Sequence, residues 1–237
     1  CAGKLEETLL SLIENWAQEF GKLSIVLSGM VGSNIGWLET PYIECPAKIN
    51  EIFGGRMKFV ARGHNVSIIP GLSCQNPLGF PDVMRGEEMQ VLGWMMSDKK
   101  HRKGCHLICL PGTHTKWVLV NDGSIVTFWT SLTGELFALL KSHSVLIAER
   151  HAEIKTQAFV AGIKAIEKIG TENLLSGLFG IRSRQIREGF PAQDAASFLS
   201  GHLIATDVIS ATRIIKKLSP DTNKVILIGE PNILDLF

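Results

Sequence analysis

The sequence lacks an excess of charge of either sign. Its 237 residues include 24 Lys and Arg against 23 Asp and Glu, which gives a formal net charge of +1. A protein without a strong overall field has no electrostatic reason to prefer nucleic acid or a membrane surface. The basic runs at 99–103 and 216–217 are short, and we interpret them as solvated loop or helix ends. We therefore expect neither nucleic acid nor a membrane as a partner.

The sequence also lacks long apolar runs and paired cysteines. No run approaches the roughly 20 apolar residues that a bilayer span needs, and no signal peptide opens the chain. The five cysteines are odd in number and do not have the spacing of a zinc ribbon. We interpret them as buried thiols in a reducing compartment, so the expected location is cytoplasmic.

Hydrophobic residues make up 45% of the chain and charged residues 20%, which is enough apolar material for a sizeable core. The apolar pattern predicts helices over 4–20, 85–94, 134–169, 172–188 and 192–217, and strands over 23–28, 65–69, 106–110, 116–120, 124–130 and 224–228. The tripeptide 121–123 (Asn-Asp-Gly) predicts a hairpin turn. A polar loop is expected after Gly71, as far as Pro81 and Asp82. These elements together predict an α/β fold with mixed sheets.

The charged stretch 97–104 is the best candidate for a domain boundary, because composition shifts there and a glycine closes it. This boundary divides the chain into residues 1–103 and 104–237. The chain opens with Cys-Ala-Gly rather than methionine, and it ends six residues after a loop-like Gly-Glu-Pro. We therefore expect both ends to be cut from a longer protein.

Three polar segments lie next to predicted strands, and ligands of open α/β sheets gather beyond the carboxyl ends of strands. The first segment contains Gly29, Met30, Gly32, Ser33 and Asn34. Its small residues would let backbone amides approach a ligand, and its last two side chains supply polar groups. A purely structural turn explains the same pattern equally well.

The second segment lies between two predicted strands and consists of Gly112, Thr113, His114, Thr115 and Lys116. Its glycine permits a bent backbone, and its hydroxyls and ammonium could meet phosphate oxygens. It lacks the spacing of a Walker A loop. The alternative is a polar hairpin in which the histidine is hydrogen-bonded locally.

The third segment places Asp82, Arg85, Glu87 and Glu88 at the start of a predicted helix. Acids there are common, because they interact favourably with the helix dipole. The functional interpretation is a carboxylate base beside a cation, which is the pair that phosphoryl transfer to an alcohol requires.

The chain resembles the 2-dehydro-3-deoxygalactonokinase family in strings that occur in this order: VLSGMVGSNIGW, PDVMRGEEMQVLGW, LPGTHTKWV, SLTGELFALL, FGIRSRQI and ASFLSGHLIATDV. The ordered set is specific and covers nearly all of residues 25–230. The family belongs to the actin-like ATPase superfamily, with hexokinase and glycerol kinase. The resemblance implies two ribonuclease-H-like α/β domains flanking a cleft. Residues 1–103 would then form a substrate-side domain and residues 104–237 a nucleotide-side domain.

The resemblance also assigns ligands to residues. It implies ATP and Mg²⁺ as cofactors. The second phosphate loop corresponds to Gly112, Thr113, His114, Thr115 and Lys116, and the start of the adenosine loop to Gly229, Glu230 and Pro231. The sugar acid would contact Gly29, Met30, Gly32, Ser33, Asn34 and Trp37, together with Thr133 and Glu135 of the second domain.

The resemblance implies a catalytic carboxylate that precedes the second phosphate loop. We predict Glu87 as this base, with Asp82 as the next candidate, and we expect Arg85 to bind the substrate carboxylate or the transferring phosphoryl group. The chain departs from the family in one respect, because the D-x-G-S-T-x-x-R hairpin, whose aspartate helps to place magnesium, does not occur in it. No metal ligand is assigned, and these residues alone are expected to bind Mg-ATP poorly.

The function that the resemblance implies is ATP-dependent phosphorylation of 2-dehydro-3-deoxy-D-galactonate at its terminal hydroxyl, which gives the 6-phosphate in galactonate catabolism. One alternative is a kinase for another sugar or sugar acid. Another is a non-catalytic module that senses sugar acids or nucleotides. A nicotinamide-dependent oxidoreductase is disfavoured, because no G-x-G-x-x-G follows the first predicted strand.

Overall fold

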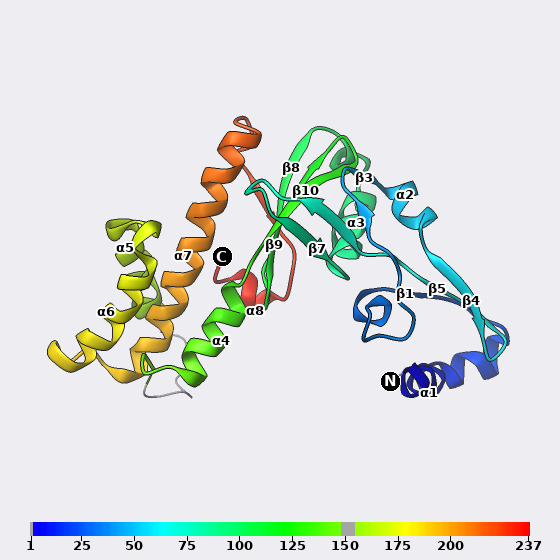
Figure 1. Ribbon diagram of the computed structural model, residues 1–237, viewed down its shortest axis with the longest axis horizontal. Helices are drawn as coiled ribbons and strands as arrows, with labels where there is room; N and C mark the ends of the chain where they lie inside the picture. The colour runs from blue at the N-terminus through cyan, green and yellow to red at the C-terminus, as the bar shows by residue number, and fades with distance from the viewer. Residues whose placement is uncertain (1, 148–154) are drawn as a thin grey trace. The chain divides into compact units, whose positions relative to one another are not determined.

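The computed structural model describes residues 2–147 and 155–237 and has a mixed α/β architecture (Figure 1). Strands dominate up to Ser131, and helices dominate after it. The predicted α/β class with mixed sheets is therefore confirmed. The part of the predicted helix 134–169 that covers 148–154 lies outside the described residues.

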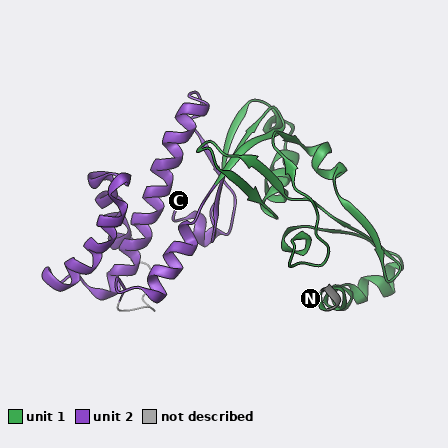
Figure 2. Cartoon of the chain, viewed as in Figure 1, with its two compact units in different colours: residues 1–108, 118–129 green, residues 109–117, 130–237 purple. Residues whose placement is uncertain are grey.

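The chain divides into two compact units (Figure 2). Unit 1 consists of Cys1–Ile108 and Val118–Trp129, and unit 2 of Cys109–Trp117 and Thr130–Phe237. Each unit is therefore built from two separate stretches of sequence. The assignment of one domain to 1–103 and another to 104–237 stays a prediction.

The chain begins with helix α1 (Ala2–Phe20). The first sheet of unit 1 follows it along the chain and has the strand order β1-β5-β4. Strand β1 (Ser24–Leu27) pairs in parallel with β5 (His64–Ile68), which pairs antiparallel with β4 (Met57–Ala61). The β-branched side chains of Val66 and Ile68 are buried, as expected for alternate residues on one face of a strand. The sheet therefore carries a buried apolar face directly before the polar segment that starts at Gly29.

The predicted polar loop after Gly71 is wrong. Strands β6 (Leu72–Gln75) and β7 (Pro81–Met84) form an antiparallel pair there, and β2 (Ile43–Glu44) joins β6 in parallel. Leu72 and Cys74 are buried, whereas the residues between and after them are more exposed. Alternation over so few residues is too short to recognise in a sequence, and a half-buried hairpin therefore resembles a loop.

A five-stranded sheet with the order β11-β8-β9-β10-β3 contains the strands around the predicted phosphate loop. Its strands are β8 (Cys105–Leu110), β9 (Thr115–Asn121), β10 (Ser124–Ser131), β3 (Ala47–Lys48) and β11 (Val225–Leu227). The predicted hairpin is confirmed, because Asp122 and Gly123 have φ of 45° and 77° between β9 and β10. The residues of β9 are buried from Thr115 to Val120, so the strand is buried from the residue at which the polar loop leads into it.

Helices form most of unit 2. They are α4 (Thr133–His143), α5 (Thr156–Ile169), α6 (Leu174–Arg187), α7 (Ala192–Leu218) and the short α8 (Pro231–Leu234). Figure 1 shows α5, α6 and α7 side by side, and the core between the helices includes Ile181, Phe198 and Leu199. Among the described helices, α7 alone is long and apolar enough to cross a bilayer, but 61% of its most apolar window is buried. That burial is typical of the central helix of a folded unit.

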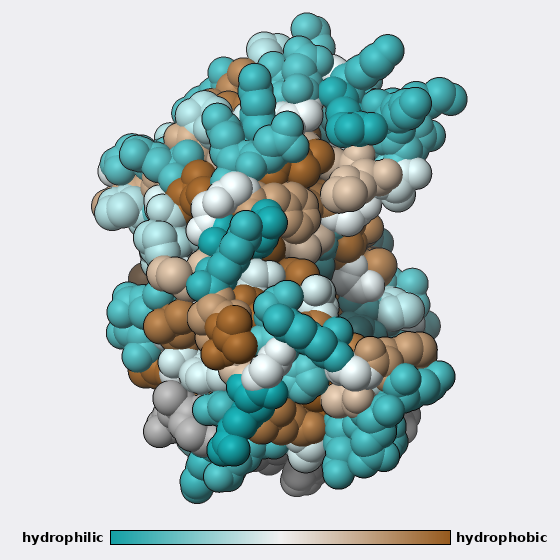
Figure 3. All heavy atoms as spheres, turned by 90° about the vertical axis from the view of Figure 1, so that its right-hand side faces the viewer, coloured by the Kyte–Doolittle hydropathy of each residue, from teal (hydrophilic) through white to brown (hydrophobic). Residues whose placement is uncertain are grey.

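Two further helices belong to unit 1: α2 (Ile49–Gly54) and α3 (Glu87–Ser97). The sequence pattern predicted α3 but not α2, β2, β3 or β4. In α1, Ile13 is buried, whereas Leu12 and Trp16 are 72% and 60% exposed. Apolar side chains also lie scattered among polar ones on the face that Figure 3 shows.

Candidate active site

The first polar segment forms a short 3₁₀ helix over Gly29–Gly32, directly after β1. The hydroxyl of Ser33 donates to the carbonyl of Met30 (2.8 Å), which closes the turn. Gly32 is buried, and a Cβ atom built on it would lie 2.7 Å from Oγ1 of Thr40 and 2.9 Å from Nη1 of Arg85. A side chain at this position would therefore displace the arginine, so the structure brings the first segment and Arg85 together.

Arg85 lies between β7 and α3, where its guanidinium is held by neutral groups. Nη1 donates to Oγ1 of Thr40 (2.5 Å), and Nη2 donates to the carbonyl of the same residue (2.8 Å). The guanidinium carbon also lies 4.3 Å from the centre of the Tyr42 ring, which is a cation–π contact. Each terminal nitrogen carries a second N–H, so the guanidinium can still donate two hydrogen bonds to a planar anion. Sequence reasoning missed Thr40 and Tyr42, whose partner is more than 40 positions away.

The two acids after Arg85 close the start of α3. Oε2 of Glu87 accepts from the backbone N–H of Arg85 (3.1 Å), and Oε2 of Glu88 accepts from that of Gly86 (2.6 Å). Gly86 has φ of 113°, a conformation that side chains other than glycine rarely adopt. The turn therefore directs both carboxylates back toward the backbone that precedes them.

The two acids differ in burial. Glu87 is half-buried, whereas Glu88 is 0% exposed. Burial raises the pKa of Glu88 to about 7, and the bond from Gly86 N–H opposes this only in part. The second oxygen of Glu88, Oε1, is buried and has no hydrogen-bond partner in the described part of the chain. Glu87 is therefore the more accessible of the two for a substrate.

Asp82 and Trp37 lie in structural contacts of their own. Oδ2 of Asp82 in β7 accepts from Nδ2 of Asn76 (3.2 Å), the residue that follows β6. The ring of Trp37 packs edge-on against that of Phe59, with 5.1 Å between the ring centres. Asn34 and Met30 are exposed. The roles assigned to these residues stay predictions.

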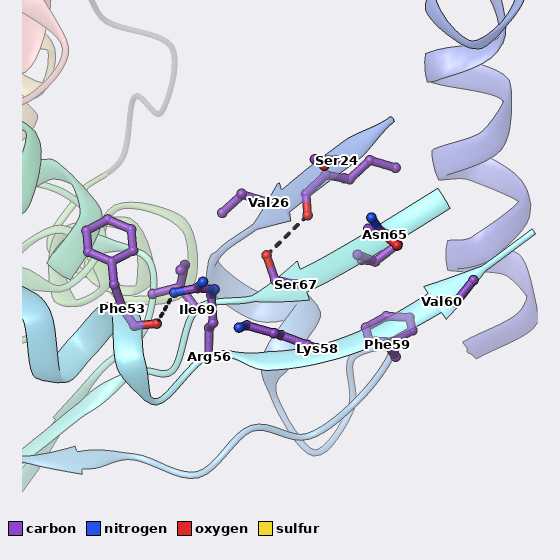
Figure 4. A pocket seen from close by; sticks show the side chains of 12 residues that line it. Ser24, Val26, Phe53, Arg56, Lys58, Phe59, Val60, Asn65, Ser67 and Ile69 are labelled. Carbon is purple, nitrogen blue, oxygen red and sulfur yellow. Dashed lines mark hydrogen bonds between the residues drawn. The ribbon is translucent and has the colours of Figure 1, made fainter. Parts of the chain in front are cut away.

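Figure 4 shows a separate hollow of about 620 Å³ on the β1-β5-β4 sheet. Its wall includes the cations Arg56 and Lys58 and the polar side chains of Asn65 and Ser67. Arg56 donates from Nη1 to the carbonyl of Phe53 (2.6 Å). None of the residues predicted from the sequence lines this hollow, so it does not belong to the candidate site.

In unit 2, the second polar segment is the tight turn between β8 and β9 that the pattern predicted. Thr113 and His114 are exposed at its tip, whereas Thr115 is 0% and Lys116 5% exposed. Oγ1 of Thr115 is buried without a hydrogen-bond partner in the described residues. Lys116 already lies within β9, so a phosphate contact would require its ammonium to reach the turn from a nearly buried position.

The amino-terminal end of α4 packs directly on this turn. The backbone N–H of Glu135 donates to the carbonyl of Thr113 (2.8 Å), and the carboxylate of Glu135 pairs with Nε2 of His114. A Cβ atom on Gly134 would lie only 2.3 Å from the carbonyl oxygen of Gly112. The segments 112–115 and 133–135 therefore pack into one cluster, which we call the loop cluster. In it His114 is held by Glu135, which lies 21 positions along the chain, and its predicted contact with phosphate stays a prediction.

The predicted adenosine segment lies next to the loop cluster. Ile228 donates its backbone N–H to the carbonyl of Cys109 (3.0 Å), and a Cβ atom on Gly229 would lie 3.6 Å from the carbonyl oxygen of Pro111. Pro231 begins α8. The end of β11 and the entry to the turn are therefore neighbours.

A cavity of about 260 Å³ opens on the loop cluster. One side is polar and the other is apolar, and the lining residues are Gly112, Thr113, Thr115, Thr133, Gly134, Phe137, Ala138, Ser200, Leu203, Ile204, Ile233, Leu236 and Phe237. The unpartnered hydroxyl of Thr115 belongs to this lining. An apolar pocket with a few convergent polar groups is typical of a small-molecule site.

The described residues do not by themselves build a metal site. Among residues 2–147 and 155–237, no group of three or more His, Cys, Asp or Glu side chains could hold a metal ion. The four cysteines described, Cys45, Cys74, Cys105 and Cys109, are free thiols. Magnesium in sites for phosphoryl transfer usually takes one or two carboxylates together with phosphate oxygens and water, so this finding assigns no ligand to it.

Comparisons with known proteins agree with one another. The family model described as 2-keto-3-deoxy-galactonokinase matches residues 1–237. The chain is 38% identical over 195 residues to a protein of Rhizobium meliloti (strain 1021) that is named as a 2-dehydro-3-deoxygalactonokinase. The matched residues make up 80% of this chain and 61% of that protein. It is 37% identical over 203 residues to the 2-dehydro-3-deoxygalactonokinase of Escherichia coli (strain K12), which covers 85% of this chain and 65% of that protein.

The fold has a solved counterpart. The crystal structure of a protein named as a 2-dehydro-3-deoxygalactonokinase from Sinorhizobium meliloti matches with a TM-score of 0.85 and 33% identity, over 97% of this chain and 75% of that chain. The present chain spans less than two thirds of the length of the two curated relatives.

Proposed function

This chain belongs to the 2-keto-3-deoxy-galactonokinase family, and we propose that its protein transfers the γ-phosphoryl group of ATP to the terminal hydroxyl of 2-dehydro-3-deoxy-D-galactonate. The product is the 6-phosphate. Both curated relatives carry the name of this activity, at 38% and 37% identity. The proposed location is the cytoplasm, where ATP is available.

The loop cluster is the observation that carries the proposal. Its exposed tip offers the hydroxyl of Thr113 and a bent backbone beside the amino-terminal end of α4, where the helix dipole favours anions. The adjoining cavity of about 260 Å³ has an apolar wall from α4, α7 and α8. We assign the phosphates of ATP to residues 112–115 of the cluster and the adenosine to the cavity, with the segment 229–231 beside it, and the sugar-acid contacts of Thr133 and Glu135 stay predictions.

The Arg85 surroundings suit the acceptor. Thr40 and Tyr42 fix the orientation of the guanidinium, and its remaining N–H groups match the planar carboxylate of a sugar acid. We assign the substrate carboxylate to Arg85. The segment from Gly29 to Asn34 contributes polar groups beside it.

We assign the base to Glu87. A carboxylate that orients the acceptor hydroxyl and takes its proton must be accessible, and Glu87 is half-buried at the start of α3. Glu88 has a pKa of about 7, which suits a base at neutral pH, but it is 0% exposed. Asp82 stays the second candidate. Mg²⁺ is proposed as the partner of the ATP phosphates, and its protein ligands are not assigned.

The test is a coupled ADP-release assay on the full-length protein with ATP and a panel of acceptors. The panel contains several 2-keto-3-deoxy sugar acids, the corresponding neutral sugars and no acceptor. We expect ADP release and a phosphorylated product with 2-dehydro-3-deoxy-D-galactonate, and much less of either with neutral sugars. Faster turnover of another acid would identify a different kinase, and nucleotide binding without product would identify a sensing module.

A further inference from the structure

We propose that Asp207 is a positioning residue for ATP, which holds the start of α4 and strand β9 so that the loop cluster keeps its shape. This inference rests on the proposed kinase function, but it concerns a residue that touches neither substrate. Sequence reasoning did not single out Asp207, although it lies in the string ASFLSGHLIATDV.

Asp207 connects the two chain segments on either side of the loop cluster. Its Oδ2 accepts from Oγ1 of Thr133 (2.6 Å), the first residue of α4, and its Oδ1 accepts from Nε1 of Trp117 (2.9 Å) in β9. The side chain of Ser131, the last residue of β10, donates to the same carboxylate. One acid on α7 therefore bonds to the last residue of β10, to the first residue of α4 and to a residue within β9.

The loop cluster depends on where α4 begins. Thr133 is followed directly by Gly134, which already lies against the carbonyl of Gly112, and by Glu135, which bonds to Thr113 and His114. Gly134 and Glu135 contact Gly112 and Thr113 directly, so we expect a shift of Thr133 to displace the tip of the turn. The hydrogen bond from its hydroxyl to Asp207 restrains the position of Thr133.

The surroundings of Asp207 agree with a role in positioning rather than contact with a ligand. It is 6% exposed, and it lines a smaller cavity of about 170 Å³ rather than the cavity of about 260 Å³ to which we assign the adenosine; Thr133 lines both. Burial raises its pKa, while the bonds from Thr133, Ser131 and Trp117 act in the opposite direction. A buried carboxylate surrounded by hydroxyl and indole donors is a strong and directional acceptor.

The test compares Asp207→Ala and Asp207→Asn in the full-length protein by steady-state kinetics with each substrate varied. Because a displacement of about 1 Å can cost about 10²-fold in rate, we expect kcat/KM for ATP to fall by about 10- to 100-fold in Asp207→Ala. The KM for the sugar acid should change less than about twofold. Asp207→Asn keeps an acceptor oxygen, so its kcat/KM for ATP should lie between the values of the wild type and of Asp207→Ala.

A matched control and a second pair of variants separate positioning from folding. Asp194 lies on the same helix and pairs with Nζ of Lys155 (2.9 Å), so Asp194→Asn should lower the melting temperature without changing the KM for ATP. Thr133→Val should reproduce the loss seen in Asp207→Ala, Thr133→Ser should rescue it, and the double variant Thr133→Val/Asp207→Asn should be no worse than Thr133→Val alone.

A lower melting temperature with unchanged KM for ATP, or additive losses in the double variant, would overturn the inference. If the wild-type protein phosphorylates no acceptor, the proposed function fails instead. In that case the inference is judged by the affinity for ADP and by the indole N–H signal of Trp117, which Asp207→Asn should move and Asp194→Asn should leave in place. An unmoved signal together with unchanged ADP affinity would refute it.

Discussion

The buried acid Glu88 gives a sharp prediction about stability and pH. Its pKa rises from an ordinary 4.5 to about 7 in the folded protein. Below pH 4.5 both the folded and the unfolded chains carry the proton. Between pH 4.5 and about 7 the unfolded chain loses the proton while the folded chain keeps it, so stability falls as the pH rises. Above about pH 7 the loss is complete and amounts to about 3 kcal/mol.

The perturbation is Glu88→Gln, because glutamine resembles the protonated acid and still accepts the bond from Gly86 N–H. We expect the variant and the wild type to unfold with the same free energy near pH 4. The variant should then gain about 1.4 kcal/mol per pH unit relative to the wild type, up to about pH 7, and stay level above it. Urea unfolding followed by circular dichroism at several pH values measures this difference.

Salt provides the control. The main cause of the raised pKa is burial, and the repulsion by Glu87 is a smaller one. A difference caused by burial should persist in about 1 M salt, whereas one caused by a neighbouring charge should shrink. A difference in free energy that does not change with pH, or a variant that is less stable than the wild type at pH 8, would refute the assignment of Glu88 as a neutral buried acid.

Three further predictions concern the proposed reaction. Glu87→Gln should lower kcat in the ADP-release assay by about 10²-fold while leaving binding of both substrates nearly intact, and near-normal turnover would shift the role of base to Asp82 or Glu88. Arg85→Lys should raise the KM for the sugar acid about tenfold without a comparable effect on ATP, because lysine cannot replace the paired N–H groups; an equal effect on both substrates would contradict this. Gly134→Ala should weaken ATP binding and lower the melting temperature, since its Cβ would meet the Gly112 carbonyl at 2.3 Å, whereas Gly93→Ala in α3, with nothing within 4 Å, should do neither.

The sequence was informative where structure follows from local pattern. The apolar runs and the Asn-Asp-Gly turn correctly predicted β8, β9 and β10 and therefore the tight turn at Gly112. The order of the resembling strings predicted the family, which the comparisons bear out. Patterns of this kind are carried by neighbouring residues, so a single sequence reveals them.

The sequence was uninformative where a residue acts through a distant partner. Thr40 meets Arg85 across 45 positions, and Asp207 meets Thr133 and Trp117 across 74 and 90 positions. An acid on an otherwise apolar helix face was the available signal for Asp207, because burial of such a group requires donors nearby. The packing of α7 decides which donors meet this acid, and the spacing of residues along the chain does not reveal that packing.

The distance along the chain between Asp207 and its partners also sets an order of events during folding. Trp117 and Thr133 are synthesised about 90 and 74 residues before the carboxylate that holds them. A growing chain can therefore pair β8 with β9 early, but the cavity that we propose for the nucleotide cannot form until α7 has docked. In refolding experiments, the capacity to bind ADP should accordingly appear after most of the strand and helix signal has returned.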